Sequence, residues 1–588
     1  MAIRTVLVAN RGEIAIRIIR ACHELGLRAV AVYSDADEGA LHTRLADEAR
    51  RIGPPPARSS YLDAAALVAA AAAAGADAVH PGYGLLSEDA GFARAVRAAG
   101  LTFVGPSPEV IATMADKVTA RRLAEECGVP VPPGTGDLTP EQAPAEAERI
   151  GYPVVVKASF GGGGRGMRVV GSAAELADAM AAAGREAAAA FGRPEVHLER
   201  YLERPRHVEV QVLGDTQGTV VHLADRDCSV QRRHQKLLEE APASGLPDGL
   251  RSRLLDAALT LSRKVGYVGA GTVEFLVLPA SDEFFFLEMN TRLQVEHGVT
   301  ELVTGRDIVA TQLRIADGEP LPFTQADVQV TGHALQARIA AEDPWQDFRP
   351  APGAITELRL PEGPGIRNDF GVESGGSVPP HYDSMFGKVL VHAENRDDAR
   401  RLLDDALAGL RVTGIPTTAP FLRQVLSSAS FAAGTHDTGS VAREWTPAPG
   451  GPVVSPAAAE TREAGGSATV RRVHIASDRG PIDVAIYGRA TPAAARAVPS
   501  SRPVRERAAA AGDAAAAEAG APVAPMDATV VAVKVEPGQQ VEPGDVIAVL
   551  EAMKMEMEIR ADTAGTVATV HATAGASVPA GSPLVTFA

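Results

Sequence analysis

The chain has 588 residues, a formal net charge of −16 and three cysteines. This length predicts about four domains of roughly 150 residues each, and the acidic charge argues against nucleic-acid binding, which depends on neutralising phosphates with Lys and Arg. Cys22, Cys127 and Cys228 are too few and too scattered for a disulfide framework or a zinc site, so a cytoplasmic location is expected.

The first elements predict a parallel sheet. A strand is expected over 5–9, a helix over 13–25 and a second strand over 28–33. This order predicts a right-handed βαβ crossover, and the absence of GxGxxG argues against dinucleotide binding. The apolar run over 64–79 contains Gly75 and Asp77, so it predicts a globular helix and no membrane span. The N-terminus shows no signal-peptide pattern.

A glycine-rich segment follows the next apolar strand. The strand is expected over 152–156 and ends at Lys157, and the segment contains Gly163 and Gly164. Glycines let backbone N–H groups approach phosphates closely, and a lysine adds a point charge. Flexible surface turns have the same composition, and the segment is no Walker motif because it lacks GK[ST].

Two acidic residues face each other in a predicted hairpin. Strands over 271–278 and 283–289 flank a turn, and a register symmetric about Ser281 places Glu274 opposite Glu288. Like charges in this position destabilise a sheet. A divalent cation such as Mg²⁺ between them would remove the repulsion; the alternative is that both glutamates face solvent.

The residues after Glu288 predict a second set of polar groups. If the chain stays extended, its period of two places on one face the side chains of Glu288, Asn290, Arg292, Gln294 and Glu296. Such a strip indicates a site for a metal and a small anion. Arg292 can hold an oxyanion in bidentate fashion, and Glu296 can act as a general base.

The C-terminal part contains an internal repeat. After strands and a helix over 397–410, Pro/Ala/Gly-rich segments flank a strand-like island over 470–487. The stretch from Thr529 then repeats from Thr566, with glycines at matching places, which predicts a small β domain with quasi-twofold symmetry. Lys554 lies near the tip of the hairpin that joins the copies, between Met553 and Met555. Taken alone, it could be an ordinary surface lysine.

The string EAMKM at Glu551 resembles the biotinyl-carrier domain of biotin-dependent carboxylases. The resemblance implies that Lys554 carries biotin through an amide bond, attached by a biotin protein ligase. Lipoyl carriers share this fold but usually lack methionines on both sides of the lysine. Met526-Asp527-Ala528 departs from the common Met-Pro-Gly.

Five further strings resemble the biotin carboxylase family of the ATP-grasp fold: NRGEIA at Asn10, HPGYGLLSE at His80, KASFGGGGRGM at Lys157, RDCSVQRRHQK at Arg226 and EMNTRLQVEH at Glu288. Gln336, near Arg338, departs from the family pattern. The resemblance implies an α/β protein with a Rossmann-like parallel sheet over 1–114, an ATP-grasp domain over 115–330, a mixed α/β carboxylase domain over 331–447, an Ala/Pro-rich linker with a small β element over 448–524 and an all-β biotinyl domain over 525–588.

The same resemblance implies roles for individual residues. ATP is expected to contact Lys117, Lys157, Gly163, Gly164, Glu199, Tyr201, Leu202, His207, Gln231 and His234. Mg²⁺ or Mn²⁺ is expected on Glu274, Glu288 and Asn290, and bicarbonate on Lys236, Arg292, Gln294 and Val295. Glu296 would take the proton of bicarbonate, Arg338 would stabilise the biotin enolate, and Tyr83 would border the biotin pocket.

The expected activity is ATP-dependent carboxylation of biotin by a ligase that forms a C–N bond. Carboxybiotin would pass to a separate carboxyltransferase β-subunit that carboxylates acetyl-CoA or propionyl-CoA, which predicts a hetero-oligomer. A chain that serves pyruvate or urea would share every motif. Two further alternatives are a pure carrier on a degenerate scaffold and an ATP-grasp ligase with a lipoyl-like tail.

Overall fold

The computed structural model describes residues 2–158, 167–191, 193–447, 469–477, 480–488, 522–552 and 555–588. The chain divides into two units, one with residues 1–454 and 520–588 and the other with residues 455–519. In the second unit, β23 (Thr469–Ser477) and β24 (Gly480–Gly488) pair antiparallel, in agreement with the strand-like island expected there. No helix among the described residues is long and apolar enough to cross a bilayer.

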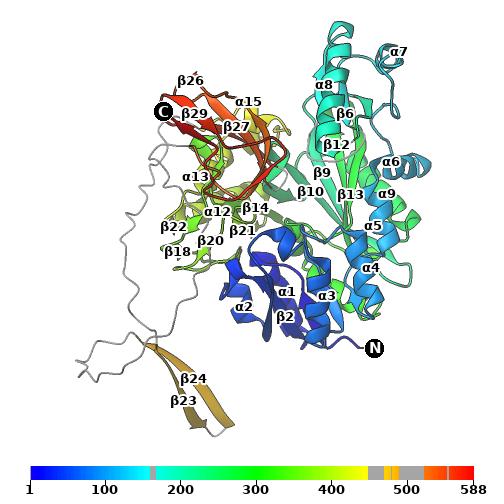
Figure 1. Ribbon diagram of the computed structural model, residues 1–588. Coiled ribbons are helices and arrows are strands. Elements are labelled where there is room, and N and C mark those ends of the chain that lie inside the picture. Colours follow the sequence, from blue (N-terminus) through cyan, green and yellow to red (C-terminus); the bar gives the residue numbers. More distant parts are fainter. Residues whose placement is uncertain are drawn as a thin grey trace. The chain divides into compact units, whose positions relative to one another are not determined.

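The N-terminal part is built on a five-stranded parallel sheet with the order β3-β2-β1-β4-β5, drawn in blue in Figure 1. Its strands are β1 (Thr5–Val8), β2 (Arg28–Ser34), β3 (Glu48–Gly53), β4 (Ala78–His80) and β5 (Thr102–Phe103). The crossover from β1 to β2 is α1 (Gly12–Glu24), which buries Ile14 and Ile18 against the sheet, as its apolar periodicity predicts.

The helix predicted over 64–79 is shorter than expected. α3 (Ala64–Ala73) ends before Gly75, which has a φ of +63°. This left-handed conformation suits glycine and terminates the helix. The remaining apolar residues form β4, so composition alone was wrong about the end of this segment.

An eight-stranded antiparallel sheet forms the centre of the first unit, with the order β13-β12-β9-β10-β11-β14-β21-β19. Its strands are β9 (Arg206–Gly214), β10 (Val220–Arg232), β11 (Gln235–Ala241), β12 (Gly269–Leu278), β13 (Glu283–Asn290), β14 (His333–Ala340), β19 (Ile366–Phe370) and β21 (Met385–Ala393). Because β11 pairs with β14, one sheet continues across residue 330.

A smaller sheet with the order β7-β6-β8 carries Lys157. It contains β6 (Val154–Ala158), β7 (Arg168–Val170) and β8 (Val196–Arg200), and α8 (Ala173–Phe191) covers it. The neighbouring helices are α6 (Lys117–Glu126), α9 (Asp248–Lys264), α10 (His297–Thr304) and α11 (Ile308–Ala316). Of these, α9 packs against β9 and β10, and α10 packs against β14. On the other half of the large sheet, α12 (Arg396–Gly409) packs against β21 and β14.

The C-terminal domain confirms the predicted repeat. β25 (Ala528–Val533) and β26 (Gln540–Val541) of the first copy correspond to β29 (Gly565–Val570) and β30 (Ser577–Val578) of the second. Matching glycines share the left-handed conformation, with φ of +88° at Gly538 and +83° at Gly575. β27 (Val546–Ala552) pairs with β28 (Met555–Arg560), so the predicted hairpin is present.

Asp527 has a structural use within this domain. Its Oδ1 accepts a hydrogen bond of 2.9 Å from the backbone N–H of Ala580, and the neighbouring Met526 and Ala528 are buried. The departure from Met-Pro-Gly therefore leaves the first strand anchored to the second copy.

A buried carboxyl group makes stability depend on pH. Burial raises the pKa of Glu342 from 4.5 to about 7, and Ser384 donates a 2.6 Å hydrogen bond to it. Since the folded pKa is the higher one, stability is lost as pH rises from 4.5 through 7. We expect Glu342→Gln to add about 3 kcal/mol to the free energy of unfolding near pH 8 and almost nothing near pH 4. Urea unfolding at both pH values measures this, and an equal gain at both would contradict it.

Candidate active site

Lys236, on β11, is the centre of a buried cluster of acids. Its Nζ lies 2.6 Å from Glu209 Oε2, 3.0 Å from Glu274 Oε1 and 2.7 Å from Glu296 Oε1. These carboxylates come from β9, from β12 and from the residue before α10. One ammonium therefore joins three segments that are distant in the sequence.

Glu296 is fully buried between two cations. Its Oε1 pairs with Lys236, and its Oε2 accepts a 3.0 Å hydrogen bond from Nη2 of Arg338. Although burial opposes ionisation, Lys236 and Arg338 hold the pKa of Glu296 well below its ordinary value. This arrangement places a carboxylate where an anion can also meet two positive charges.

The predicted extended strip beyond Glu288 is wrong after Asn290. β13 ends at Asn290, and Glu296 is the N-cap residue of α10, so the intervening residues form a loop. The expected convergence nevertheless occurs, through hydrogen bonds. Arg292 donates to Asn290 Oδ1 at 2.8 Å and to Gln294 Oε1 at 2.9 Å.

The remaining bonds of this loop hold Arg292 and Val295 in place. Arg292 Nε donates to Glu88 at 2.8 Å, and the backbone N–H of Thr291 donates to the same carboxylate. Lys388 Nζ, from β21, donates to the carbonyl oxygen of Val295 at 2.9 Å. The loop is therefore fixed at both ends by charged side chains from elsewhere in the chain.

The hairpin register was predicted correctly: Glu274 on β12 lies directly opposite Glu288 on β13. Burial raises the pKa of Glu288, and the negative charge of Glu274 raises it further. Asn290 Nδ2 also donates to Glu274 at 2.8 Å, so three oxygen-bearing side chains meet here. Hard oxygen donors and repelling carboxylates fit a Mg²⁺ ion.

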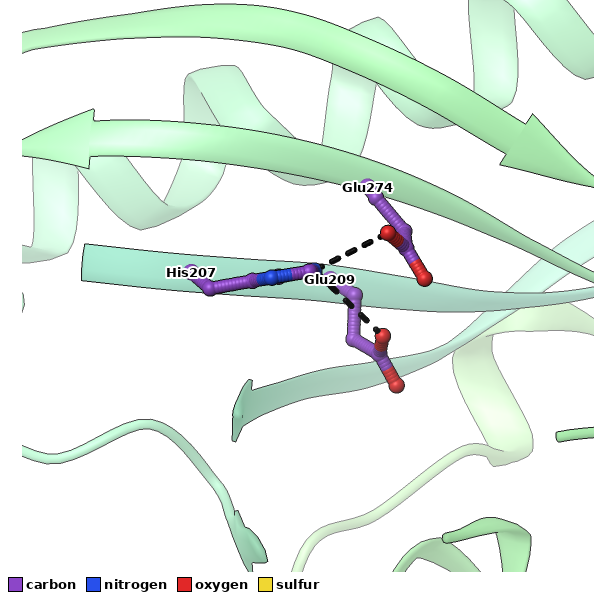
Figure 2. Close-up of side chains that lie close together, drawn as sticks. All are labelled: His207, Glu209 and Glu274. Carbon is purple, nitrogen blue, oxygen red and sulfur yellow. Dashed lines mark ion pairs between the residues drawn. The ribbon is translucent and has the colours of Figure 1, made fainter. Parts of the chain in front are cut away.

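Figure 2 shows a second acidic group beside this one. His207 Nε2 lies 3.0 Å from Glu274 Oε2 and 3.9 Å from Glu209 Oε2, and the ligand atoms of all three residues lie within 4.8 Å of one another. Lys236 already pairs with both glutamates. The ammonium of Lys236 therefore already neutralises Glu209 and Glu274 in this group. A metal ion fits better between Glu274 and Glu288.

One tight hairpin presents three of the predicted residues. β10 and β11 are joined at Arg233 and His234, whose φ angles of +48° and +65° are unusual for residues with a side chain. Gln231 pairs with Lys236 across this hairpin. Such strained turns cluster at binding sites, where the strain holds a side chain in place.

The hairpin residue His234 is surrounded by positive charge. Burial lowers its pKa, and the charges of His207, Lys157 and Lys117 lower it further. Lys157 forms an ion pair with Glu199, which Arg121 also contacts at 2.9 Å. Leu202 is buried and Tyr201 is exposed at the end of β8.

Tyr83 lies at the edge of the cluster. Its hydroxyl donates a hydrogen bond to Glu13 Oε1, and the other oxygen of Glu13 lies 3.1 Å from Nζ of Lys388. Lys388 is opposite Arg338 in the β14–β21 register. The hydroxyl of Tyr83 is therefore linked, through Glu13 and Lys388, to the loop that holds Val295.

Sequence analysis missed four residues of the cluster. Arg226 is fully buried and binds Glu209 at 2.6 Å and Gln211 at 2.8 Å. Lys388 binds the loop at Val295, and Glu239 binds Arg338. A signal for Glu209 was present, because His207, Glu209 and Gln211 alternate along β9, a strand whose other side chains are mostly apolar. Gly163, Gly164 and Lys554 lie outside the described residues.

Comparison with known families gives four matches. Residues 2–111 match the biotin carboxylase N-terminal domain, 116–324 the ATP-binding domain of the carbamoyl-phosphate synthase L chain, 336–443 the biotin carboxylase C-terminal domain and 519–587 the biotin-requiring enzyme domain.

Individual relatives agree with these family matches. A biotin carboxylase of Pseudomonas aeruginosa is 51% identical over 432 residues, which are 73% of this chain and 96% of the relative. The alpha subunit of a mitochondrial methylcrotonoyl-CoA carboxylase of Arabidopsis thaliana is 50% identical over 74% of this chain, and the match spans 60% of that protein's length. The crystal structure of a Campylobacter jejuni biotin carboxylase in a β,γ-ATP complex has a TM-score of 0.72 and 45% identity, covering 75% of this chain and 99% of that one.

Proposed function

Because the chain belongs to the biotin carboxylase family, we propose that it uses ATP to activate bicarbonate and carboxylates biotin carried on Lys554. The observation that carries the proposal is the buried position of Glu296 between Lys236 and Arg338. A carboxylate flanked by two cations can meet an anion and accept its proton at one place.

The first proposed step is proton removal from bicarbonate. Lys236 and Arg292 hold the anion, with Gln294 and the backbone of Val295 beside it. Without substrate, burial opposes ionisation of Glu296, but Lys236 and Arg338 favour it and hold the pKa of Glu296 well below its ordinary value. A bound anion adds a like charge, which raises the pKa of Glu296 and makes it a better base. Bicarbonate then attacks the γ-phosphorus of ATP and forms carboxyphosphate and ADP.

The nucleotide side of the site must open an ion pair when ATP binds. Lys157 is bound to Glu199 in the free protein. Lys117 and Lys157 are proposed to bind the phosphates, and Glu199, Tyr201, Leu202, His207, Gln231 and His234 the adenosine. When Lys157 turns to a phosphate, Arg121 still neutralises Glu199.

Glu274, Glu288 and Asn290 would hold Mg²⁺. The bound ion neutralises negative charge on the phosphates. Glu288→Gln removes one carboxylate oxygen and one charge, so we expect the Mg²⁺ concentration for half-maximal ATP cleavage to rise by about tenfold or more. Titration of the activity with MgCl₂ at fixed ATP measures the shift. Glu283→Gln, an exposed carboxylate at the start of the same strand, is the control, and an unchanged Mg²⁺ dependence in Glu288→Gln would exclude this site.

Arg338 is proposed to act in the second step, when carboxyphosphate breaks down to CO₂ and phosphate. Its guanidinium binds the ureido oxygen of biotin, where negative charge develops as the released phosphate takes the proton of the ring nitrogen. The nitrogen then attacks CO₂ and forms carboxybiotin. A fixed cation acts most strongly where water is excluded, and Arg338 is held by two buried carboxylates. Tyr83 borders the same pocket.

The direct test is an assay of the purified chain with ATP, Mg²⁺ and bicarbonate, with and without free biotin. We expect ADP formation to require bicarbonate and to increase with biotin. Absence of any bicarbonate-dependent ADP formation would reject the proposal and favour the alternative of a carrier on a degenerate scaffold.

A separate carboxyltransferase β-subunit is the proposed partner, since the Arabidopsis relative is named for the alpha chain of its carboxylase. The acceptor we propose is an acyl-CoA, and pyruvate is the alternative, because a subunit of the pyruvate carboxylase of Methanothermobacter thermautotrophicus is 50% identical over 74% of this chain. Co-purification followed by assays with acetyl-CoA, propionyl-CoA, methylcrotonoyl-CoA, pyruvate and urea separates them. The free cysteines support a cytoplasmic location.

A further inference from the structure

Gln336 on β14 lies directly opposite Glu239 on β11, and both side chains are completely buried. Gln336 Nε2 donates a 3.0 Å hydrogen bond to Glu239 Oε2. The other oxygen, Glu239 Oε1, accepts a hydrogen bond from Nε of Arg338. Both oxygens of one buried carboxylate are thus bound, one by an amide and one by the guanidinium.

The –NH₂ group of Gln336 faces Glu239. A donor in this position stabilises the ionised carboxylate, which only accepts hydrogen bonds. The amide oxygen, Oε1, is buried and has no hydrogen-bond partner within the described part of the chain. Gln336 therefore gives a hydrogen bond to Glu239, while its own acceptor has no partner among the described residues.

The bond acts on Arg338 through Glu239. Burial and the nearby Glu296 raise the pKa of Glu239, whereas Arg338 lowers it. Donation from Gln336 favours the ionised form. Ionised Glu239 holds one side of the guanidinium while Glu296 holds the other through Nη2 at 3.0 Å.

We propose that Gln336 is a positioning residue that keeps Glu239 ionised and thereby orients Arg338 toward biotin. This inference rests on the proposed function. It concerns mainly the biotin step, because Gln336 donates its hydrogen bond to the partner of Arg338 and reaches Glu296 only through that guanidinium.

A glutamate at position 336 would behave differently. Its carboxylate would face Glu239, and the buried place of Oε1 offers no donor among the described residues to stabilise a second charge. Two carboxyl groups this close would share one proton, because the repulsion between their charges raises the pKa at which the second proton leaves. Below that pKa the pair carries a single negative charge. Above that pKa the extra charge pulls Arg338 toward β11 and away from biotin.

Two variants of the full-length chain test the proposal, with free biotin as substrate. Gln336→Glu is expected to add an alkaline limb to the pH profile of kcat/KM for biotin, falling by up to about tenfold per pH unit. Gln336→Met removes the donor and is expected to lower kcat for biotin carboxylation by about tenfold or more. In both variants the slow bicarbonate-dependent ATP cleavage without biotin should fall much less than biotin carboxylation, because Lys236 still holds Glu296.

Gln312 gives the matched control. It is a buried glutamine on α11, and its Oε1 also lacks a partner among the described residues. Gln312→Glu and Gln312→Met should leave both rates and the pH profile unchanged. The proposal is overturned if Gln336→Glu keeps the wild-type pH profile, or if Gln336→Met loses both half-reactions equally. A wild-type chain without bicarbonate-dependent ATP cleavage would instead reject the proposed function.

Discussion

Glu296→Gln is expected to lower bicarbonate-dependent turnover by roughly two to four orders of magnitude while ATP still binds. Glutamine keeps the size of the side chain and an oxygen for Lys236, but it cannot accept a proton. The ATP residues lie around the β10–β11 hairpin and do not depend on the charge of Glu296. Steady-state ADP formation measures turnover, and equilibrium binding of a non-hydrolysable ATP analogue measures binding.

Glu301 provides a close comparison on the same helix. Like Glu296, it is buried and bound by two cations, which here are Arg17 at 2.9 Å and Arg367 at 2.7 Å. It lies outside the cluster around Lys236, so Glu301→Gln should cost stability without lowering turnover per folded molecule. If Glu296→Gln retained wild-type turnover, another group would have to be the base. Loss of nucleotide binding in Glu296→Gln would show instead that the substitution disturbs the whole site.

Local sequence patterns predicted the elements whose contacts are close in the chain. The β12–β13 register needed only two apolar runs and a turn, and it placed Glu274 opposite Glu288 correctly. The carrier repeat was equally accessible, because glycines at matching positions mark matching turns. The β12 and β13 strands follow each other directly in the chain, and the repeat is visible from its glycines although β25 pairs with β27 and β30.

Glu296 lies beside Glu274 for a different physical reason than the one assumed. A period of two does not apply beyond Asn290, where the strand ends and a loop leads into α10. The side chains converge because Arg292 and Lys236 bind several acceptors each. Hydrogen bonds and ion pairs from these two cations, and not strand geometry, therefore hold the polar side chains together.

Two of the residues that sequence analysis missed, Lys388 and Glu239, act through pairing of strands that are distant in the chain. Lys388 reaches Val295 only because β21 lies beside β14, and Glu239 meets Arg338 only because β14 pairs with β11. Such strand order depends on the whole fold. No local pattern distinguishes a buried Lys388 from a surface lysine on an edge strand.

Lys554→Ala is expected to abolish attachment of biotin to the chain. The two strands around this residue pair through their backbones as far as Ala552 and Met555, so we expect the alanine variant to keep the hairpin that a biotin ligase must recognise. The carboxylase site should be unaffected, and ATP cleavage with free biotin should persist. Intact-mass measurement after co-expression with a biotin protein ligase detects the added group.

Lys534→Ala is the matched control, because Lys534 follows β25 directly in the same domain and lies outside the EAMKM string. The Lys534→Ala chain should be fully biotinylated, and its attached biotin should be carboxylated as in the wild-type chain. Biotin retained on Lys554→Ala would show that the attachment site is misassigned. Lipoate in place of biotin on the wild-type chain would favour the alternative of an ATP-grasp ligase with a lipoyl-like tail. The hairpin fold is common to both carriers, so only the group attached to the lysine distinguishes them.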